Sequence, residues 1–266
     1  MGLLRLGAGG FGDSPIPYTL GWPIVICCFG QECIQVCSGG LFAGANPTGE
    51  RLALDAVTLL PPCQPTKMLG LWNNFAARAE FEKLQRPEHP LWFVKTNNCF
   101  MAHGEPIRRP EGYAGPVVFE GELGVVIGKP CRNVSEAEAD QYVFGYTCVN
   151  DVTARQILRS DPSFPQWSRA KSFDSFGPFG PVIATGLEPD ALTVRTLVNG
   201  EEKQNYPVAD MFFRPRAIVS RLSRDMTLMP GDIIACGTSL GAGPIWEGDL
   251  VEIEIEGVGR LSNRFV

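Results

Sequence analysis

Glu120 and Glu122 are separated by one residue within the otherwise apolar run 117–127. Residues two apart in a strand project from the same face, so we expect the two carboxylates to lie side by side. Such neighbours repel each other unless they share a proton or a cation lies between them. On an apolar strand we favour a divalent ion, and an all-oxygen site favours Mg²⁺, Mn²⁺ or Ca²⁺ over zinc. The alternative is that one carboxylate faces solvent at a twist of the strand.

Two further residues could complete such a site. Asp151 lies at the end of a predicted strand at 146–150 and is a candidate third ligand, the alternative being an ordinary turn or cap residue. Lys171 lies in a stretch rich in Phe, Gly and Pro. Its ammonium could anchor a substrate carboxylate or stabilise an enolate, whereas the alternative is a solvated surface lysine.

Composition excludes several classes of function. The chain has 266 residues, a net charge of -6 and 2 histidines, so a zinc site made of several imidazoles cannot be built. An apolar content of 44% is typical of a soluble globular protein. Because Lys and Arg are few, we expect no nucleic-acid partner. The apolar run 22–30 is much shorter than the roughly 20 residues of a membrane span, so we expect no membrane segment and a cytoplasmic location.

The elements that must position these residues are mainly strands. Short β-like pieces at 24–28, 33–37 and 51–60 precede a proline-rich connector, which predicts a small β-rich N-terminal subdomain (residues 1–64) and a larger domain (65–266). Asn199-Gly200 predicts a hairpin turn, and 215–223 predicts a helix. Ser135 and Glu138 form a capping-box pattern, which predicts a helix running to about Phe144.

Four segments together resemble one known family. Residues 120–129, 144–155, 171–181 and 230–239 resemble the fumarylacetoacetate hydrolase family and occur in that family's order, from about Pro62 to the end of the chain. Four motifs in register are far more specific than any one of them. The resemblance implies an α/β, predominantly β, fold: a mixed β-sandwich or roll around one Mg²⁺ or Mn²⁺, with Ca²⁺ as an alternative, commonly in a homodimer.

The resemblance also assigns roles residue by residue. It implies that the metal ligands are Glu120, Glu122 and Asp151 and that Lys171 is catalytic. Arg155 and Thr238 correspond to residues that contact the substrate, a small 2-oxo or 1,3-dicarbonyl acid. Leu158 departs from the pattern, because many members have a glutamine there.

The more consequential departure concerns water activation. Hydrolytic members use a histidine paired with a glutamate, in a segment that corresponds to residues 70–80 here. Ala76 or Ala77 stands in the place of that histidine, and Glu80 is the candidate for the remaining acid, its alternative being a surface glutamate. His89 and His103 are the available substitutes, but their sequence contexts are typical of loop and turn residues.

Three hypotheses follow for the function. The family default is hydrolysis of a C–C bond through a metal-stabilised enolate. The second is a keto-enol tautomerase, isomerase or decarboxylase of a 2-oxo acid, which needs no activated water; the missing general base favours this one, since such a base contributes about 10²–10⁴ in rate. The third is a non-enzymatic, metal-bound ligand-binding protein.

Overall fold

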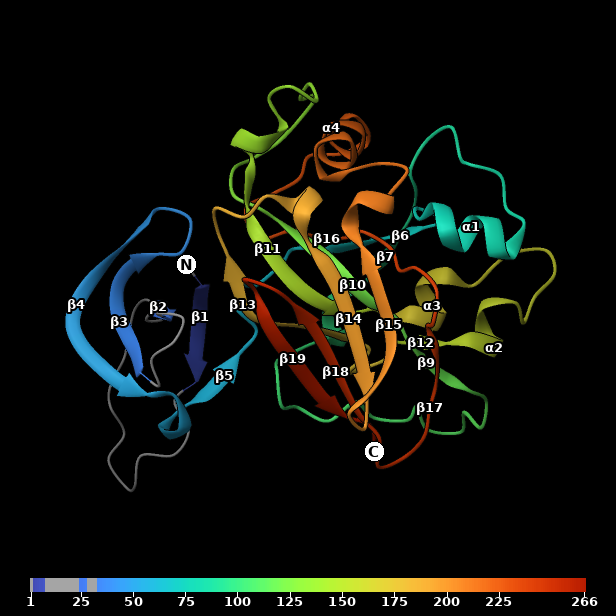
Figure 1. The fold of residues 1–266 in the computed structure, drawn as a ribbon, viewed down its shortest axis with the longest axis horizontal. Helices are drawn as coiled ribbons and strands as arrows, with labels where there is room; N and C mark the ends of the chain where they lie inside the picture. Colours follow the sequence, from blue (N-terminus) through green and yellow to red (C-terminus); the bar gives the residue numbers. More distant parts are fainter. Residues whose placement is uncertain (1, 8–23, 28–32) are drawn as a thin grey trace.

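Three β-sheets and a few short helices make up the part of the chain that this computed structural model describes, which is residues 2–7, 24–27 and 33–266 (Figure 1). The largest sheet has 12 strands. They are β1 (Gly2–Gly7), β2 (Ile24–Cys27), β3 (Cys33–Gly40), β4 (Gly44–Ala53), β5 (Thr58–Leu60), β6 (Met68–Trp72), β7 (Leu91–Lys95), β8 (Phe100–Met101), β10 (Gly121–Ile127), β11 (Val143–Asn150), β13 (Gly177–Ala184) and β16 (Ile233–Ala235).

Two smaller sheets complete the β-structure of the described residues. A 3-stranded sheet contains β9 (Val117–Phe119), β12 (Thr153–Ala154) and β17 (Gly243–Ile245). A 4-stranded sheet contains β14 (Thr193–Val198), β15 (Glu201–Pro207), β18 (Leu250–Ile255) and β19 (Gly259–Arg264). The α-helices are α1 (Ala76–Glu82), α2 (Arg155–Leu158), α3 (Trp167–Lys171) and α4 (Pro215–Asp225), and the 3-10 turns are η1 (Leu54–Ala56), η2 (Asn97–Cys99), η3 (Ala139–Gln141), η4 (Pro189–Ala191) and η5 (Val208–Asp210). The predicted, mainly β, fold is confirmed.

Strand β10 is an interior strand of the large sheet, and all of its residues are buried. It lies between β11 and β16 in the order β4-β3-β2-β1-β13-β11-β10-β16-β6-β7. Leu123 of β10 packs in the same cluster as Ile253 and Ile255 of the 4-stranded sheet, while Val126 belongs to a different cluster. Alternate side chains of β10 therefore enter cores on opposite faces, which explains its continuous apolar sequence.

The N-terminal strands extend this large sheet. Strand β1 pairs with β13, through Gly2 opposite Ala184, and also with β2 and β5. Figure 1 shows these blue strands on one side of the molecule, continuous with the rest. Strand β2 lies within the predicted piece 24–28, of which Cys28 falls outside the described residues. Backbone hydrogen bonds between β1 and β13 join the two predicted domains. The division at residue 64 stays a prediction.

Three local predictions have clear outcomes. Helix α4 and the hairpin at Asn199-Gly200 are confirmed, the latter with φ values of 52° and 81°. The predicted helix from Ser135 to about Phe144 is wrong. The Ser135 hydroxyl does donate to Glu138, at 2.5 Å, but only the 3-10 turn η3 follows before β11 begins. Pairing of β11 within the sheet overrides the local preference.

None of the helices in the described ranges is long and apolar enough to cross a bilayer.

Candidate metal centre and active site

Both predicted acidic segments lie where the chain passes from one sheet to another. Glu120 separates β9 of the 3-stranded sheet from β10 of the large sheet, and Asp151 with Val152 separates β11 from β12 in the same way. The Glu120 carbonyl accepts from the Asp151 amide at 2.9 Å, and the Glu120 amide donates to Asn150 Oδ1 at 3.2 Å. Two adjacent strands thus change sheets together, which places both carboxylates at the junction.

Three carboxylates meet at this junction. Ligand oxygens of Glu120, Glu122 and Asp151 all lie within 4.8 Å of one another. The three residues are 8%, 1% and 1% exposed, so little solvent compensates their charge. Three convergent oxygen donors suit a hard divalent cation and could hold one.

Two buried ammonium groups contact the same cluster. Lys171 Nζ, at the end of α3, lies 2.6 Å from Glu120 Oε2, 2.5 Å from Asp151 Oδ2 and 2.8 Å from Thr153 Oγ1. Lys95 Nζ, at the end of β7, donates to Asp151 Oδ1 at 2.7 Å and to the Lys171 carbonyl. Lys171 is therefore no solvated surface lysine. It is 3% exposed, and each of its three N–H donors has an acceptor.

The pKa values of Glu122 and Asp151 are shifted in opposite directions because their partners differ. Burial, together with repulsion from Asp151 and Glu120, raises the pKa of Glu122 well above its usual range. Burial also acts to raise the pKa of Asp151, but the charges of Lys171 and Lys95 outweigh it, and the pKa is lowered. Ionisation of Glu122 therefore needs a further positive charge more than that of Asp151 does, and a divalent cation would provide it.

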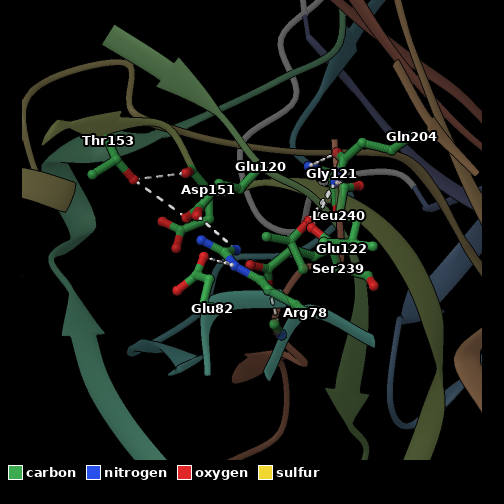
Figure 2. A network of polar contacts seen from close by, with 12 residues as sticks. Arg78, Glu82, Glu120, Gly121, Glu122, Asp151, Thr153, Gln204, Ser239 and Leu240 are labelled. Atoms are coloured by element: carbon green, nitrogen blue, oxygen red, sulfur yellow. Dashed lines mark hydrogen bonds and ion pairs between the residues drawn. The ribbon is translucent and has the colours of Figure 1, made fainter. Parts of the chain in front are cut away.

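A hydrogen-bond network holds the Glu122 side of the site. Glu122 Oε2 accepts from the Gly237 amide at 2.8 Å, and the Thr238 hydroxyl donates to the Gly121 carbonyl at 2.9 Å. Gln204 bridges these segments, since its Nε2 donates to Thr238 Oγ1. Its Oε1 accepts from the Gly121 amide (Figure 2). The hydroxyl of Thr238 therefore already has a donor and an acceptor.

The other predicted site residues lie apart from the carboxylates. Glu80 is exposed on α1, and its side chain forms no hydrogen bond or ion pair with another described residue. Arg155 is exposed at the start of α2, and its guanidinium likewise has no acceptor in the described part of the chain. The histidines contact other regions: His89 Nδ1 lies 3.2 Å from Arg221 Nη1, and His103 Nδ1 accepts from the Ser262 amide.

Helix α1 instead brings Arg78 to the cluster, together with Glu82. Arg78 Nη1 lies 3.3 Å from Glu120 Oε1, and Arg78 Nε lies 2.9 Å from Glu82 Oε1 (Figure 2). Sequence reasoning missed both residues, and it also missed Lys95 and Thr153. A signal existed for Lys95, because a single lysine ends the apolar run of β7 and a lysine is rarely buried without a charged partner.

Two family models match the chain. The family model described as fumarylacetoacetate (FAA) hydrolase C-terminal matches residues 67–266, and one described as Rv2993c-like, N-terminal matches residues 24–62.

Among curated proteins, the 4-hydroxyphenylacetate degradation bifunctional isomerase/decarboxylase of Salmonella dublin is 39% identical over 88% of this chain and 55% of its own length. The oxaloacetate tautomerase YisK of Bacillus subtilis is 39% identical over 67% of this chain and 62% of its own length. A solved structure, 5-carboxymethyl-2-hydroxymuconate delta-isomerase from Mycobacterium smegmatis, has a TM-score of 0.87 and 36% identity, covering 100% of this chain and 99% of that one. The chain belongs to the fumarylacetoacetate hydrolase family.

Proposed function

We propose that this protein is a divalent-metal-dependent isomerase that interconverts the keto and enol forms of a small 2-oxo acid through an enolate. The observation that carries the proposal is the buried Lys171, whose ammonium lies between Glu120 and Asp151 with no histidine in contact with the cluster. Relatives named as an oxaloacetate tautomerase and an isomerase/decarboxylase support the same reaction type.

Glu120, Glu122 and Asp151 would hold the ion, for which we propose Mg²⁺ or Mn²⁺. When bound, such an ion polarises the 2-oxo carbonyl and lowers the energy of the enolate.

Lys171 is the group of the chain itself that would supply positive charge to the substrate. Two of its three hydrogen bonds are made to carboxylates and the third to the neutral Thr153 hydroxyl. The bond to the hydroxyl is the weakest, because its acceptor is neutral whereas the other two acceptors carry a negative charge. A substrate oxyanion would therefore replace Thr153 as the acceptor and leave the bonds to Glu120 and Asp151 intact.

We propose Arg155 and Thr238 as contacts for the substrate carboxylate, and a separate observation supports each residue. Arg155 is exposed and offers an unused guanidinium directly after β12, which follows Asp151. Thr238 is buried next to Gly237, whose amide bonds Glu122. For Thr238 to bind substrate, its hydroxyl must exchange the bond that it now donates to Gly121.

We rank hydrolysis of a C–C bond below isomerisation. Hydrolysis requires a base that activates water, and neither His89 nor His103 contacts the acidic cluster. Glu80 is kept as a candidate acid for that reaction only.

A direct comparison of two reactions tests the proposal. Conversion of the enol of oxaloacetate to its keto form is followed by ultraviolet absorbance, and hydrolysis of an acylpyruvate is followed in parallel, each with Mg²⁺, with Mn²⁺ and with excess EDTA. We expect metal-dependent ketonisation, little hydrolysis, and a loss of at least about 100-fold in Lys171→Gln, the size typical for removal of one electrostatic donor. Lys129→Gln, at an exposed position, is the control. Hydrolysis as fast as ketonisation would contradict the ranking.

A further inference from the structure

The guanidinium of Arg78 is only partly used by the protein. Of its five N–H donors, one bonds Glu120 and one bonds Glu82, and the other three have no acceptor among the described residues. The side chain is 17% exposed, so the unused donors lie at the border between the buried carboxylates and solvent. These donors are not sealed from solvent, so they are available to an acceptor group on a ligand.

A row of aromatic rings fixes the position of this guanidinium. The ring centroid of Trp167 lies 5.4 Å from that of Trp72 and 5.5 Å from that of Phe93. Arg78 Cζ lies 4.9 Å from the centre of the Trp72 ring, and Lys171 Nζ lies 4.8 Å from that of Phe93. Both cations thus rest on one aromatic wall, and this contact limits the freedom that an arginine on the surface would have.

Glu120 sets the distance between the two cations. Its Oε1 faces Arg78 at 3.3 Å and its Oε2 faces Lys171 at 2.6 Å. Because both cations contact the two oxygens of one carboxylate, a four- or five-carbon acid is long enough to reach both. Lys171 is 3% exposed among the carboxylates, whereas Arg78, with a side chain that is 17% exposed, approaches from α1 on the solvent side.

We propose that Arg78 is a specificity-determining residue that binds a second carboxylate of the substrate, so that the enzyme prefers 2-oxo dicarboxylic acids to 2-oxo monocarboxylic acids. The proposal rests on the proposed function, with the 2-oxo end at Lys171 and the distal carboxylate at Arg78. The planar guanidinium suits this role, since its parallel N–H donors match the two oxygens of a carboxylate. Glu82, paired with Nε, keeps the remaining edge of the guanidinium turned towards the ligand.

Equilibrium binding to matched acids tests the proposal without depending on turnover. The probes are oxaloacetate against 2-oxobutyrate and 2-oxoglutarate against 2-oxovalerate, pairs in which a methyl group replaces the distal carboxylate. Dissociation constants are measured calorimetrically with Mg²⁺ present for the unaltered protein, Arg78→Gln, Arg78→Lys and the control Arg86→Gln, an exposed arginine that follows α1. Thermal unfolding checks that each variant is folded.

We expect the unaltered protein and Arg86→Gln to prefer the dicarboxylate of at least one pair. Arg78→Gln should weaken binding of that dicarboxylate by about tenfold or more, the equivalent of one charge-assisted hydrogen bond, and change its monocarboxylate partner by less than about twofold. Arg78→Lys should keep part of the preference for the dicarboxylate. If Arg78→Gln does not fold, the dissociation constants of Arg78→Lys decide whether Arg78 contributes to that preference.

Two other results would overturn the proposal in different ways. Equal weakening of both acids in each pair, or no change in either, would remove Arg78 as the second carboxylate site while leaving the proposed function intact. Failure of the unaltered protein to bind any of the four acids would overturn both the 2-oxo acid site and the role of Arg78.

Discussion

Lys95 Nζ lies 2.7 Å from Asp151 Oδ1, and the two side chains are 0% and 1% exposed. The same ammonium donates to the backbone carbonyl of Lys171. Strand β7 is thereby joined both to a candidate metal ligand and to the end of the helix that carries the candidate catalytic lysine. Lys95 is a positioning residue in this arrangement, because it acts through Asp151 and Lys171.

Replacement of this lysine should be costly for the fold. In Lys95→Met the carboxylate of Asp151 would stay buried with one ion-pair partner instead of two, and loss of one partner of a buried pair typically costs about 3–5 kcal/mol. We expect the free energy of unfolding, measured with urea, to fall by an amount in this range. Lys129→Met is the matched control, since Lys129 is exposed. A loss no larger than that of the control would mean that the buried pair contributes little.

Metal affinity should report on the carboxylates separately from activity. Glu120→Gln and Glu122→Gln each remove a charged oxygen donor, and we expect the affinity for Mn²⁺ to fall at least about tenfold in each. Calorimetric titration of Mn²⁺ measures this directly, with Glu136→Gln, at an exposed position, as the control. Unchanged affinity in both variants would show that the ion, if bound, lies elsewhere.

The backbone between these glutamates should tolerate no side chain. A Cβ atom at Gly121 would lie 2.0 Å from Thr196 Oγ1, and 3.2 Å from Gln204 Oε1. We expect Gly121→Ala to destabilise the protein by about 1–3 kcal/mol through overpacking. Thr196→Ala should restore part of that loss in the double variant, because it removes the nearest atom.

The control for this substitution is Gly243→Ala. The nearest atom that its Cβ would meet is Phe119 Cε1, at 3.8 Å, an ordinary contact distance. Denaturant unfolding is measured for Gly121→Ala, for Gly243→Ala and for the double variant Gly121→Ala/Thr196→Ala. The comparison separates the clash from the general effect of adding a methyl group. A double variant no more stable than Gly121→Ala would contradict the assigned clash.

The sequence pattern predicted the carboxylate cluster because it depends on short spacings. Glu120 and Glu122 are two residues apart, and the Asp151 that joins them follows the neighbouring strand β11, which pairs with β10. Even so, the pattern implied one continuous strand, whereas the structure interrupts it at Glu120. The change of sheets at that residue, and not strand alternation alone, brings the carboxylates together.

The residues that the sequence did not reveal depend on long-range packing or on helix phase. Lys95 is 56 residues from Asp151 along the chain, and no local pattern relates the two. Helix α1 is 7 residues long, so its sequence does not determine which face turns inward. Trp72 packs against Trp167 and Arg78 packs against Trp72, and in this orientation of α1 Arg78 contacts Glu120. Glu80 is left exposed, and Glu82 contacts Arg78.

The final prediction concerns His103 and the dependence of protein stability on pH. Burial lowers the pKa of His103 below 6.5, against smaller opposing effects of the Arg260 backbone and Glu252. Near and below pH 6.5 the unfolded chain therefore binds more protons at this residue than the folded protein does, so His103 makes stability decrease as the pH falls. Its Nδ1, which accepts from the Ser262 amide, cannot take a proton without losing that hydrogen bond.

His103→Gln should therefore flatten the dependence of unfolding free energy on pH below about 6.5, in the window above the main titration of the carboxylates. Glutamine can still accept from the Ser262 amide, so the packing is largely kept. His89→Gln is the matched control, because His89 is exposed and lies in a loop. Denaturant unfolding at several pH values between about 5.5 and 7 measures both slopes. If the slope of His103→Gln equalled that of His89→Gln and of the unaltered protein, the half-buried His103 could not be the source of the acid sensitivity.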